Sequence, residues 1–341
     1  MRVSLLVWTI AGLILTHVAT LAAQAAMPCG AGPREQDDVW LISCRGIGCG
    51  QGPQQVERLR YWHYDRAAGW QVAALTDLLA TDDPDVVTVV FLHGNRIPFD
   101  EAFTKGWSAY RSVVACADDR PVRFVIWSWP SEPLRGLVND ARTKAARTDP
   151  CGYCLAWVLD RIKPQVPVSC WAHSFGARIV TGALHLLGGG QLNGQRLAER
   201  THTQRDPMQV VLLAAAVDSD WLLPGRLEDR AMSQVSSMLL INNGCDALLK
   251  RYHMIYCRRS CQQALGYTGL AAGYLAGSDR GKVSQLDAGG VVGRRHLFAN
   301  YLCSPDLMAR MRSYLLFDNT STVTAAKPTD DADTQIELAL D

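Results

Sequence analysis

The 341-residue sequence has almost no excess of charge, because 34 lysines and arginines are balanced by 33 acidic residues and leave a formal net charge of +1. Proteins that bind DNA or RNA need a basic stripe or patch to meet the phosphates. We therefore expect no nucleic-acid partner. The composition, with 48% hydrophobic and 20% charged residues, is that of an ordinary globular protein and excludes a largely disordered chain.

Motifs for metal and phosphate binding are also missing. No His-Glu-x-x-His or similar ligand spacing occurs in the sequence. The run Gly188-Gly189-Gly190 follows a predicted helix instead of preceding one, so it cannot place a phosphate at a helix N-terminus. We expect neither a metal nor a cofactor.

Long hydrophobic runs are confined to the N-terminus. Arg2 precedes an apolar stretch that continues to Ala26, and Ala23-Gln24-Ala25 supplies a small-residue cleavage site. This pattern is typical of a secretory signal peptide over residues 1–25, with an uncleaved membrane anchor as the alternative. We predict an exported protein (periplasmic, envelope or secreted) with one domain over residues 26–318. Residues 319–341 read as an acidic, solvated tail.

Cysteine is abundant, and all 11 cysteines follow the signal-like segment. In an oxidising compartment most of them would pair, and the odd number leaves at least one free thiol. Cys170 is the candidate for that thiol because it lies in an apolar strand. The motif Cys151-Gly152-Tyr153-Cys154 could belong to a thiol oxidoreductase, but such a site directly follows a buried strand. A polar, helix-like segment precedes it here, which favours a structural disulfide.

Strand-like and helix-like segments alternate along the chain after residue 37. The predicted strands cover residues 38–43, 59–64, 86–92, 122–127, 166–172, 208–216, 237–241 and 283–287. The predicted helices cover residues 102–114, 134–147, 154–162, 175–187 and 296–316. This alternation predicts an α/β fold with a doubly wound, mostly parallel sheet and helices on both faces.

A serine stands between one of these buried strands and the following helix, in the segment Trp171-Ala172-His173-Ser174-Phe175-Gly176. Such a turn can lift the serine Oγ clear of the sheet if small residues flank it at two positions on either side. Ala172 and Gly176 satisfy that requirement, with alanine in the place of the usual first glycine. Ser174 is therefore the predicted nucleophile. The alternative is an ordinary turn in which the serine caps the helix.

A second loop can supply hydrogen-bond donors for an oxyanion. His93-Gly94-Asn95-Arg96 directly follows an earlier central strand, and Gly94 allows a sharp turn there. We predict that the backbone N–H groups of Asn95 and Phe175 form an oxyanion hole. His93 is expected to hold this loop and not to carry protons.

The orienting acid and the base are expected after the serine in sequence. Asp246 follows the strand that ends near residue 241, and His296 precedes the last helix. In the predicted triad His296 takes the proton of Ser174, and Asp246 fixes the imidazole tautomer. The rival acids and bases are Asp218, Asp220, Asp287, His173 and His253.

These motifs in this order resemble the α/β-hydrolase superfamily, and within it the chain is most similar to a poorly characterised bacterial family of hydrolase-like proteins. The likeness covers residues 38–316. It rests on Phe91-Leu92-His93-Gly94, Ala172-His173-Ser174-Phe175-Gly176, Asp246-Ala247-Leu248, Leu265-Gly266 with Gly269, Asp287, and His296-Leu297-Phe298.

The resemblance implies a serine hydrolase that acts on an ester, thioester or amide through an acyl-enzyme. Together with the signal-like segment it predicts an exported enzyme with a small-molecule or lipid-like ester as substrate. A catalytically inactive scaffold on the same fold is the alternative. The Cys-bearing stretch Lys250 to Lys282 departs from the family pattern. It could be part of a lid or acyl pocket, or a structural insertion pinned by disulfides.

Overall fold

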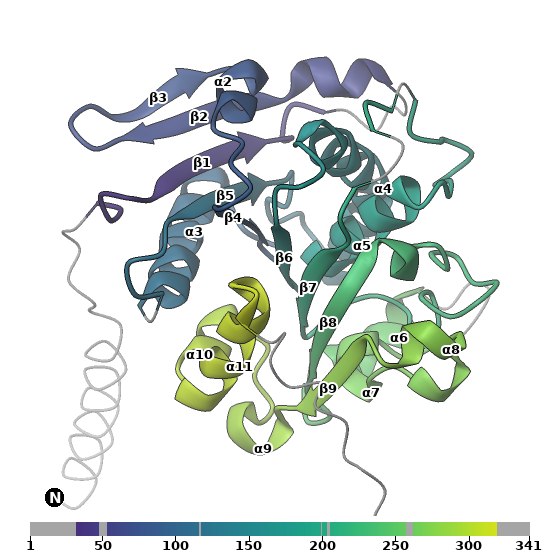
Figure 1. Cartoon of the computed structure of the whole chain (residues 1–341). Coiled ribbons are helices and arrows are strands. Elements are labelled where there is room, and N and C mark those ends of the chain that lie inside the picture. The colour runs from purple at the N-terminus through teal and green to yellow at the C-terminus, as the bar shows by residue number, and fades with distance from the viewer. Residues whose placement is uncertain are drawn as a thin grey trace, which may run out of the picture.

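The computed structural model describes residues 32–47, 53–115, 117–198, 200–202, 205–256 and 262–318. The predicted signal segment and the predicted acidic tail lie outside these residues, as do five of the cysteines. In the described part, nine strands form a single sheet with helices on both faces (Figure 1). The strands are β1 (Asp38–Ser43), β2 (Arg60–Asp65), β3 (Gly69–Ala73), β4 (Val87–Leu92), β5 (Val122–Ser128), β6 (Val168–His173), β7 (Met208–Leu213), β8 (Val235–Asn242) and β9 (Val283–Asp287).

The strand order across the sheet is β3-β2-β1-β5-β4-β6-β7-β8-β9. The first two neighbouring pairs, β3–β2 and β2–β1, are antiparallel, and all other pairs are parallel. Strands β4, β6 and β7 are buried along nearly their whole length, as expected for parallel strands covered on both faces. The prediction of a doubly wound, mostly parallel sheet is confirmed.

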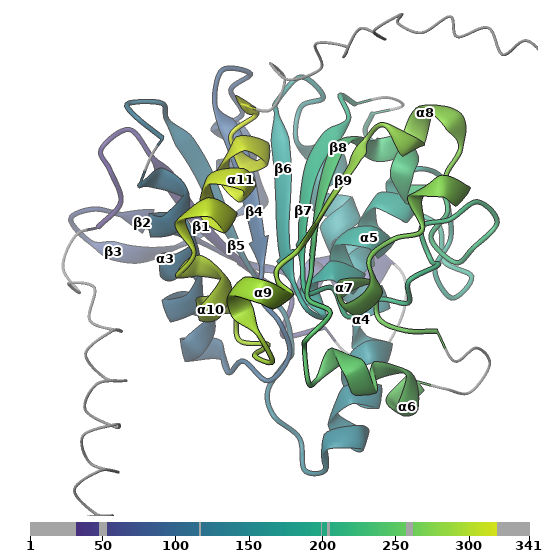
Figure 2. The same ribbon diagram turned by 90° about the horizontal axis from the view of Figure 1, so that it is seen from below.

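Two pairs of long helices make the outer layers. On one face α4 packs against α5, and on the other α3 packs against α11 (Figure 2). The α-helices are α2 (Leu75–Ala80), α3 (Phe99–Val114), α4 (Leu137–Arg161), α5 (Gly176–Leu187), α6 (Tyr252–Tyr256), α7 (Leu265–Thr268), α8 (Gly277–Arg280), α9 (Gly289–Val292), α10 (Phe298–Leu302) and α11 (Pro305–Leu315). Short 3-10 turns occupy Pro53–Arg58, Ala231–Gln234, Leu249–Arg251 and Ala272–Tyr274.

The structure differs from the sequence prediction in several elements, including the short helices α2 and α6 to α9, which were not predicted. Strand β3 was not predicted, because Gly69–Ala73 is half exposed and lacks a clear apolar alternation. The two helices predicted on either side of residue 150 are one continuous helix, α4, although Pro150 lies inside it. Burial of residues 151–156 outweighs the cost of the missing proline N–H. The predicted last helix is divided into α10 and α11, where Ser304 caps α11 through the Leu307 N–H.

Most of the described cysteines lie in the core and not on the surface. In the part of the chain that the structure describes, all six cysteines are free, and four of them are buried: Cys44, Cys151, Cys154 and Cys170. The surface disulfides expected from the sequence are therefore not found among these residues. Cys170 is free, as expected. The predicted Cys151–Cys154 disulfide is not found: both residues are free and lie inside α4.

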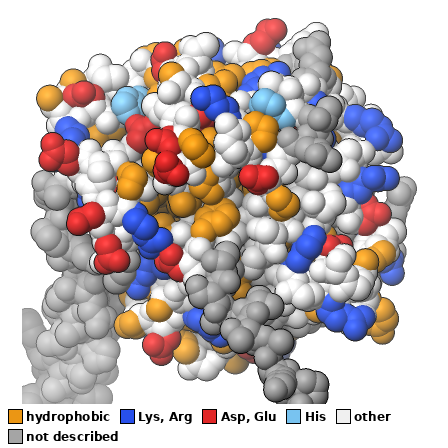
Figure 3. Space-filling model, viewed as in Figure 1, with side chains coloured by type: hydrophobic (Ala, Val, Ile, Leu, Met, Phe, Trp, Pro, Cys, Tyr) orange, Lys and Arg blue, Asp and Glu red, His pale blue; other side chains and the backbone are white. Residues whose placement is uncertain are grey.

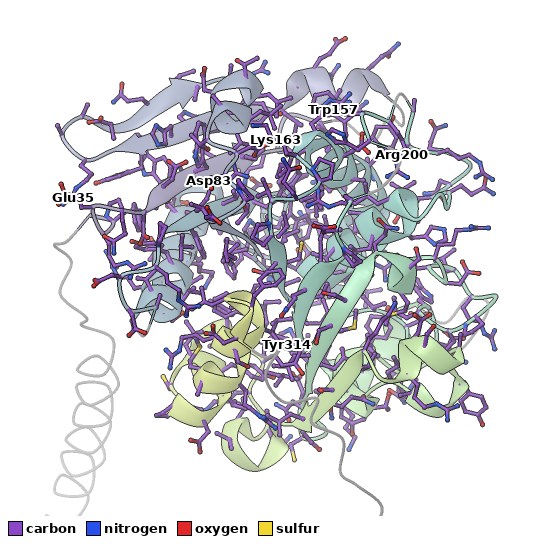
Figure 4. The ribbon with its side chains drawn as sticks, in the orientation of Figure 1. Glu35, Asp83, Trp157, Lys163, Arg200 and Tyr314 are labelled. Carbon is purple, nitrogen blue, oxygen red and sulfur yellow. The ribbon has the colours of Figure 1, made fainter. Side chains whose placement is uncertain are left out.

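Figures 1, 3 and 4 view the molecule from the side on which the central parallel strands begin. Figure 4 labels Asp83 and Lys163, which precede β4 and β6. On the described surface of this face, acidic, basic and apolar side chains are interspersed (Figure 3), which agrees with the small net charge. Within the described ranges, no helix combines the length and apolarity needed to cross a membrane.

Candidate active site

The predicted catalytic residues lie at the edge of the sheet where the parallel strands end. Ser174 directly follows β6 and has φ 54°, a left-handed conformation that is strained for a residue with a side chain. Backbone bonds hold the turn, because the Ser174 N–H donates to Leu213 O at 3.0 Å and its carbonyl accepts from Ala216 N at 3.1 Å. The sharp strand–turn–helix geometry predicted from the sequence is present.

Gly176 makes this turn possible. A Cβ placed there would lie 2.7 Å from Leu92 O and 3.0 Å from His93 O, so any side chain would collide with the backbone after β4. The loop after β4 passes equally close to the serine. A Cβ on Gly94 would lie 3.2 Å from Ser174 Cβ. Only glycine at both positions lets the two loops approach each other in this way.

The predicted base reaches the serine across the end of the sheet. His296 Nε2 lies 2.8 Å from Ser174 Oγ, and His296 Nδ1 lies 2.6 Å from Asp246 Oδ2. Asp246 is fully buried, and its other oxygen, Oδ1, accepts the N–H groups of Leu248 and Leu249 at 2.8 and 3.0 Å. The structure therefore brings Ser174, His296 and Asp246 into one hydrogen-bonded chain with the connectivity of a nucleophile, base and orienting acid.

The rival acids are engaged elsewhere. Asp287 Oδ1 accepts the N–H groups of Gly244 and Gly289, so it fastens the loops that follow β8 and β9. Asp218 accepts a hydrogen bond from Tyr252 Oη at 2.6 Å, and Asp220 pairs with Arg226 at 3.5 Å. Among the described hydrogen bonds and ion pairs, none joins these three acids to His296, whereas Asp246 contacts it.

Two further histidines stand beside the serine. His173 Nε2 donates to the carbonyl of His296 at 2.9 Å, and the two rings lie 5.1 Å apart. Burial and the neighbouring His296 hold the pKa of His173 well below its ordinary value. His173 is thus a neutral donor that positions the backbone of His296, a role that the sequence did not suggest.

His93 is held in the loop after β4. Its Nδ1 donates to Gly94 O at 2.9 Å, and the Trp129 indole donates to its carbonyl at 2.8 Å. Burial lowers the pKa of His93 to about 3, so the ring stays neutral over the working range of most enzymes. The expected role as a loop-holding residue fits these contacts.

The predicted oxyanion residues, Asn95 and Phe175, both line the same pocket as Ser174. Asp140, which was not singled out from the sequence, anchors the loop after β4 that carries Asn95. Its Oδ2 accepts from Asn95 Nδ2 at 2.7 Å and lies 3.4 Å from the Arg96 guanidinium. Its Oδ1 accepts from Leu134 N at 2.6 Å. Asp140 therefore ties the loop after β4 to the start of α4.

Asn243 joins the loop after β8, which carries Asp246, to the segment before α10, which carries His296. It was not singled out from the sequence. Its side-chain amide donates to the carbonyls of Gly293 and Arg295 at 2.8 and 3.2 Å, while its oxygen accepts from Cys245 N. The residue is fully buried. Asp246 and His296, which are 50 residues apart in sequence, are thereby held in register.

A pocket of about 690 Å³ opens in front of the serine. This is the size of sites that enclose a drug-sized ligand. It is lined by residues from the loops already described and from the starts of α3, α4 and α10, including Phe91, Asn95, Arg96, Ile97, Leu137, Ala141, Ser174, Phe175, Leu248, Arg251, Tyr252, His296, Leu297 and Phe298.

Part of the stretch Lys250 to Lys282 lines the pocket, through Arg251 and Tyr252. Gly266 packs against the end of β7, where a Cβ would lie 2.1 Å from Ala215 N. Tyr274 is largely exposed. Cys257 and Cys261 are outside the described residues, so the choice between a lid and a disulfide-pinned insertion stays open.

The dithiol alternative has no support in the geometry. Cys151 and Cys154 lie inside α4 and are both fully buried. Burial raises the pKa of each thiol well above its ordinary value, whereas a reactive thiol needs a lowered pKa and access to solvent.

The sheet order, the serine turn after β6 and the convergence of three loops at the strand ends define an α/β-hydrolase fold. The chain has the α/β-hydrolase fold, and the family described as "Alpha/beta hydrolase of unknown function (DUF900)" matches residues 71–238, just under half of the chain. That match contains Asn95 and Ser174 and ends before Asp246. No curated protein matches the chain.

Several solved structures are similar at low identity. Esterase B from Lactobacillus rhamnosis, bound to a tributyrin phosphonate, is 12% identical with a TM-score of 0.39, over 93% of this chain and 97% of that one. A gene product from Listeria innocua is 10% identical with a TM-score of 0.35, over 68% and 94%. An acetyl xylan esterase is 15% identical with a TM-score of 0.31, over 67% and 98%. Similarity at this level carries no information about the substrate.

Proposed function

We propose that the protein is an exported serine hydrolase that cleaves carboxylic esters through an acyl-enzyme. The observation that carries the proposal is the chain of hydrogen bonds from Ser174 Oγ to His296 at 2.8 Å and from His296 to the buried Asp246 at 2.6 Å, at the mouth of a pocket. No described group of His, Cys, Asp and Glu side chains could hold a metal ion. The proposed chemistry uses side chains and backbone N–H groups of the protein, with water as the second reactant.

In the first half of the reaction, Ser174 Oγ attacks the ester carbonyl carbon while its proton passes to His296 Nε2. The backbone N–H groups of Asn95 and Phe175 stabilise the negative charge on the carbonyl oxygen. When the tetrahedral intermediate collapses, the C–O bond to the alcohol breaks. The protonated His296 gives its proton to the leaving alkoxide, and the acyl group remains on Ser174.

In the second half, water enters the place of the alcohol. His296 Nε2 takes a proton from the water as its oxygen attacks the acyl carbon. Collapse of this intermediate returns the proton to Ser174 Oγ and releases the carboxylic acid. Asp246 stays ionised throughout and stabilises the imidazolium that forms in each half.

The proposal is tested by pre-steady-state hydrolysis of p-nitrophenyl acetate. We expect a burst of p-nitrophenol equal to the enzyme concentration, followed by slower turnover, because acylation precedes hydrolysis. Ser174→Ala is expected to remove both phases, and Ser313→Ala, at a half-buried serine of α11 that does not line the pocket, serves as the matched control. Equal hydrolysis by the wild type and Ser174→Ala would refute the serine mechanism. A folded wild type without any activity would favour an inactive scaffold.

Export is part of the same proposal. The apolar N-terminal segment with its Ala23-Gln24-Ala25 site supports cleavage after residue 25. Mass spectrometry of the protein recovered outside the cytoplasm is expected to give an N-terminus at Ala26. A chain retained in the membrane that begins at residue 1 would instead indicate an anchor.

A further inference from the structure

Three leucines at the pocket mouth are largely exposed to solvent. The exposed fractions are 73% for Leu137, 57% for Leu248 and 69% for Leu297, and all three line the pocket that contains Ser174. They come from three separate segments: the start of α4, the loop after Asp246 and the residue after His296. The fold therefore gathers apolar side chains around the reaction centre from positions that are far apart in the sequence.

Exposed leucines that share one opening differ from leucines scattered singly on a surface. Single exposed apolar residues are common and need no explanation, but a cluster around a cavity is typical of a site that binds an apolar ligand. Val72 and Leu227 are also exposed, at 85% and 52%, and they are not among the residues that line this pocket. These two residues therefore provide a comparison within the same molecule.

The pocket continues inward as an apolar surface. Behind the leucines, Ile97, Leu249 and Phe298 line the wall. The described lining contains three cations. Arg96 is paired with Asp140 at 3.4 Å, Lys105 with Glu101 at 2.9 Å, and Arg251 donates to Ala247 O at 2.7 Å. A volume of about 690 Å³ is far larger than an acetyl group needs.

From this arrangement, and resting on the proposed ester hydrolysis, we infer that the substrate is an ester that carries a long aliphatic chain. The chain lies along the apolar wall and across Leu137, Leu248 and Leu297, while its ester group meets Ser174. Each methylene that leaves water for this wall strengthens binding of the transition state. Selectivity for chain length is therefore built into the same loops that carry the catalytic residues.

The test is a chain-length series measured below the concentration at which the esters form micelles. One arm lengthens the acyl part, from p-nitrophenyl acetate through butyrate and octanoate to dodecanoate. The other arm lengthens the alcohol, from methyl to octyl acetate. In at least one arm kcat/KM is expected to rise by about tenfold or more between the shortest ester and the eight-carbon chain. The arm that rises identifies the side of the ester that occupies the wall.

The variant Leu137→Ser/Leu248→Ser is expected to reduce the long-to-short ratio of kcat/KM by about fivefold or more. Val72→Ser/Leu227→Ser, which changes equally exposed residues outside the pocket, is expected to keep the wild-type ratio. Leu297 is left unchanged because it adjoins His296.

If kcat/KM does not change with chain length in either arm, the inference is overturned, while ester hydrolysis by Ser174 remains in place. A fall in the ratio that is the same for both double variants would also overturn it. If the folded wild type cleaves none of these esters, the proposed function fails together with the inference.

Discussion

At the scale of single residues, Asp246 has two oxygens with different tasks. Oδ1 accepts the N–H groups of Leu248 and Leu249, and Oδ2 meets His296 Nδ1. Because backbone donors occupy one oxygen, the second is aimed at the imidazole. This arrangement requires the His296 tautomer with hydrogen on Nδ1, which leaves Nε2 free to accept the proton of Ser174.

We predict that Asp246→Asn lowers kcat by about a thousandfold or more while the protein stays folded. The amide oxygen would keep the two backbone N–H bonds, so the NH₂ group would face His296 Nδ1 and force hydrogen onto Nε2. Steady-state kinetics on a short ester measures the effect. Asp287→Asn is the control, because Asp287 bonds only loop N–H groups among its described partners. A larger loss in the control than in Asp246→Asn would contradict the assignment of the acid.

The residues of the candidate site differ in how visible they are in the sequence. Ser174 could be predicted because a strand, a small-residue turn and a helix follow one another locally. His296 and Asp246 could be predicted because parallel strands end at one edge of a sheet. Asp140 and His173 could not, since their roles depend on contacts made across 45 and 123 residues of chain.

At the scale of elements, the loop after β4 is held from two sides. Asp140, at the start of α4, binds Asn95 and Arg96 from one side. From the other side the Arg45 guanidinium donates to Ile97 O at 3.0 Å and to Ser128 Oγ at 2.6 Å, and it pairs with Glu132. In the proposed mechanism, this fastening preorganises the loop whose Asn95 N–H stabilises the oxyanion.

We predict that Asp140→Ala lowers kcat by about tenfold to a hundredfold with a smaller change in KM, because the loop that carries Asn95 loses its buried anchor. Asp140→Asn keeps one acceptor oxygen and is expected to fall between the wild type and the alanine variant. Kinetics on a short ester, with circular dichroism to verify folding, provides the measurement. Alanine and asparagine variants that both match the wild type would show that the loop needs no anchor.

Two of the elements that the sequence prediction missed, the continuous helix α4 and strand β3, both depend on contacts with other parts of the fold. Buried strands such as β4 and β6 are evident from their continuous apolar runs. The sequence predicts two helices around Pro150 because proline disfavours a helix there. In the structure, packing against α5 stabilises α4 as one continuous helix. Strand β3 lies at the edge of the sheet, where pairing with β2 supplies what the sequence pattern does not.

At the scale of the whole molecule, a buried carboxyl links stability to pH. Glu228 is 1% exposed and its Oε2 has no hydrogen-bond partner among the described residues. Burial raises the pKa of Glu228 from 4.5 to about 8. The folded protein therefore keeps a proton that the unfolded chain releases, so the contribution of this group is complete below pH 4.5 and is lost as the pH rises toward 8.

We predict that Glu228→Gln removes this dependence and stabilises the protein at pH 9 by roughly 2 kcal/mol or more, with little change at pH 4. Urea unfolding at several pH values gives the free energy of unfolding for both proteins. Parallel curves for the wild type and the variant between pH 4 and 9 would contradict the expected proton linkage.

The central claim is that Ser174 is a nucleophile activated by His296, and labelling with a fluorophosphonate probe tests it most directly. The Ser174 oxygen would displace fluoride and form a stable phosphonate ester, which intact-mass spectrometry detects. The account predicts one probe per wild-type molecule, located at Ser174 by peptide mapping, with no labelling of Ser174→Ala and strongly slowed labelling of His296→Ala. A folded wild type that does not react, or that reacts equally in all three proteins, would contradict it.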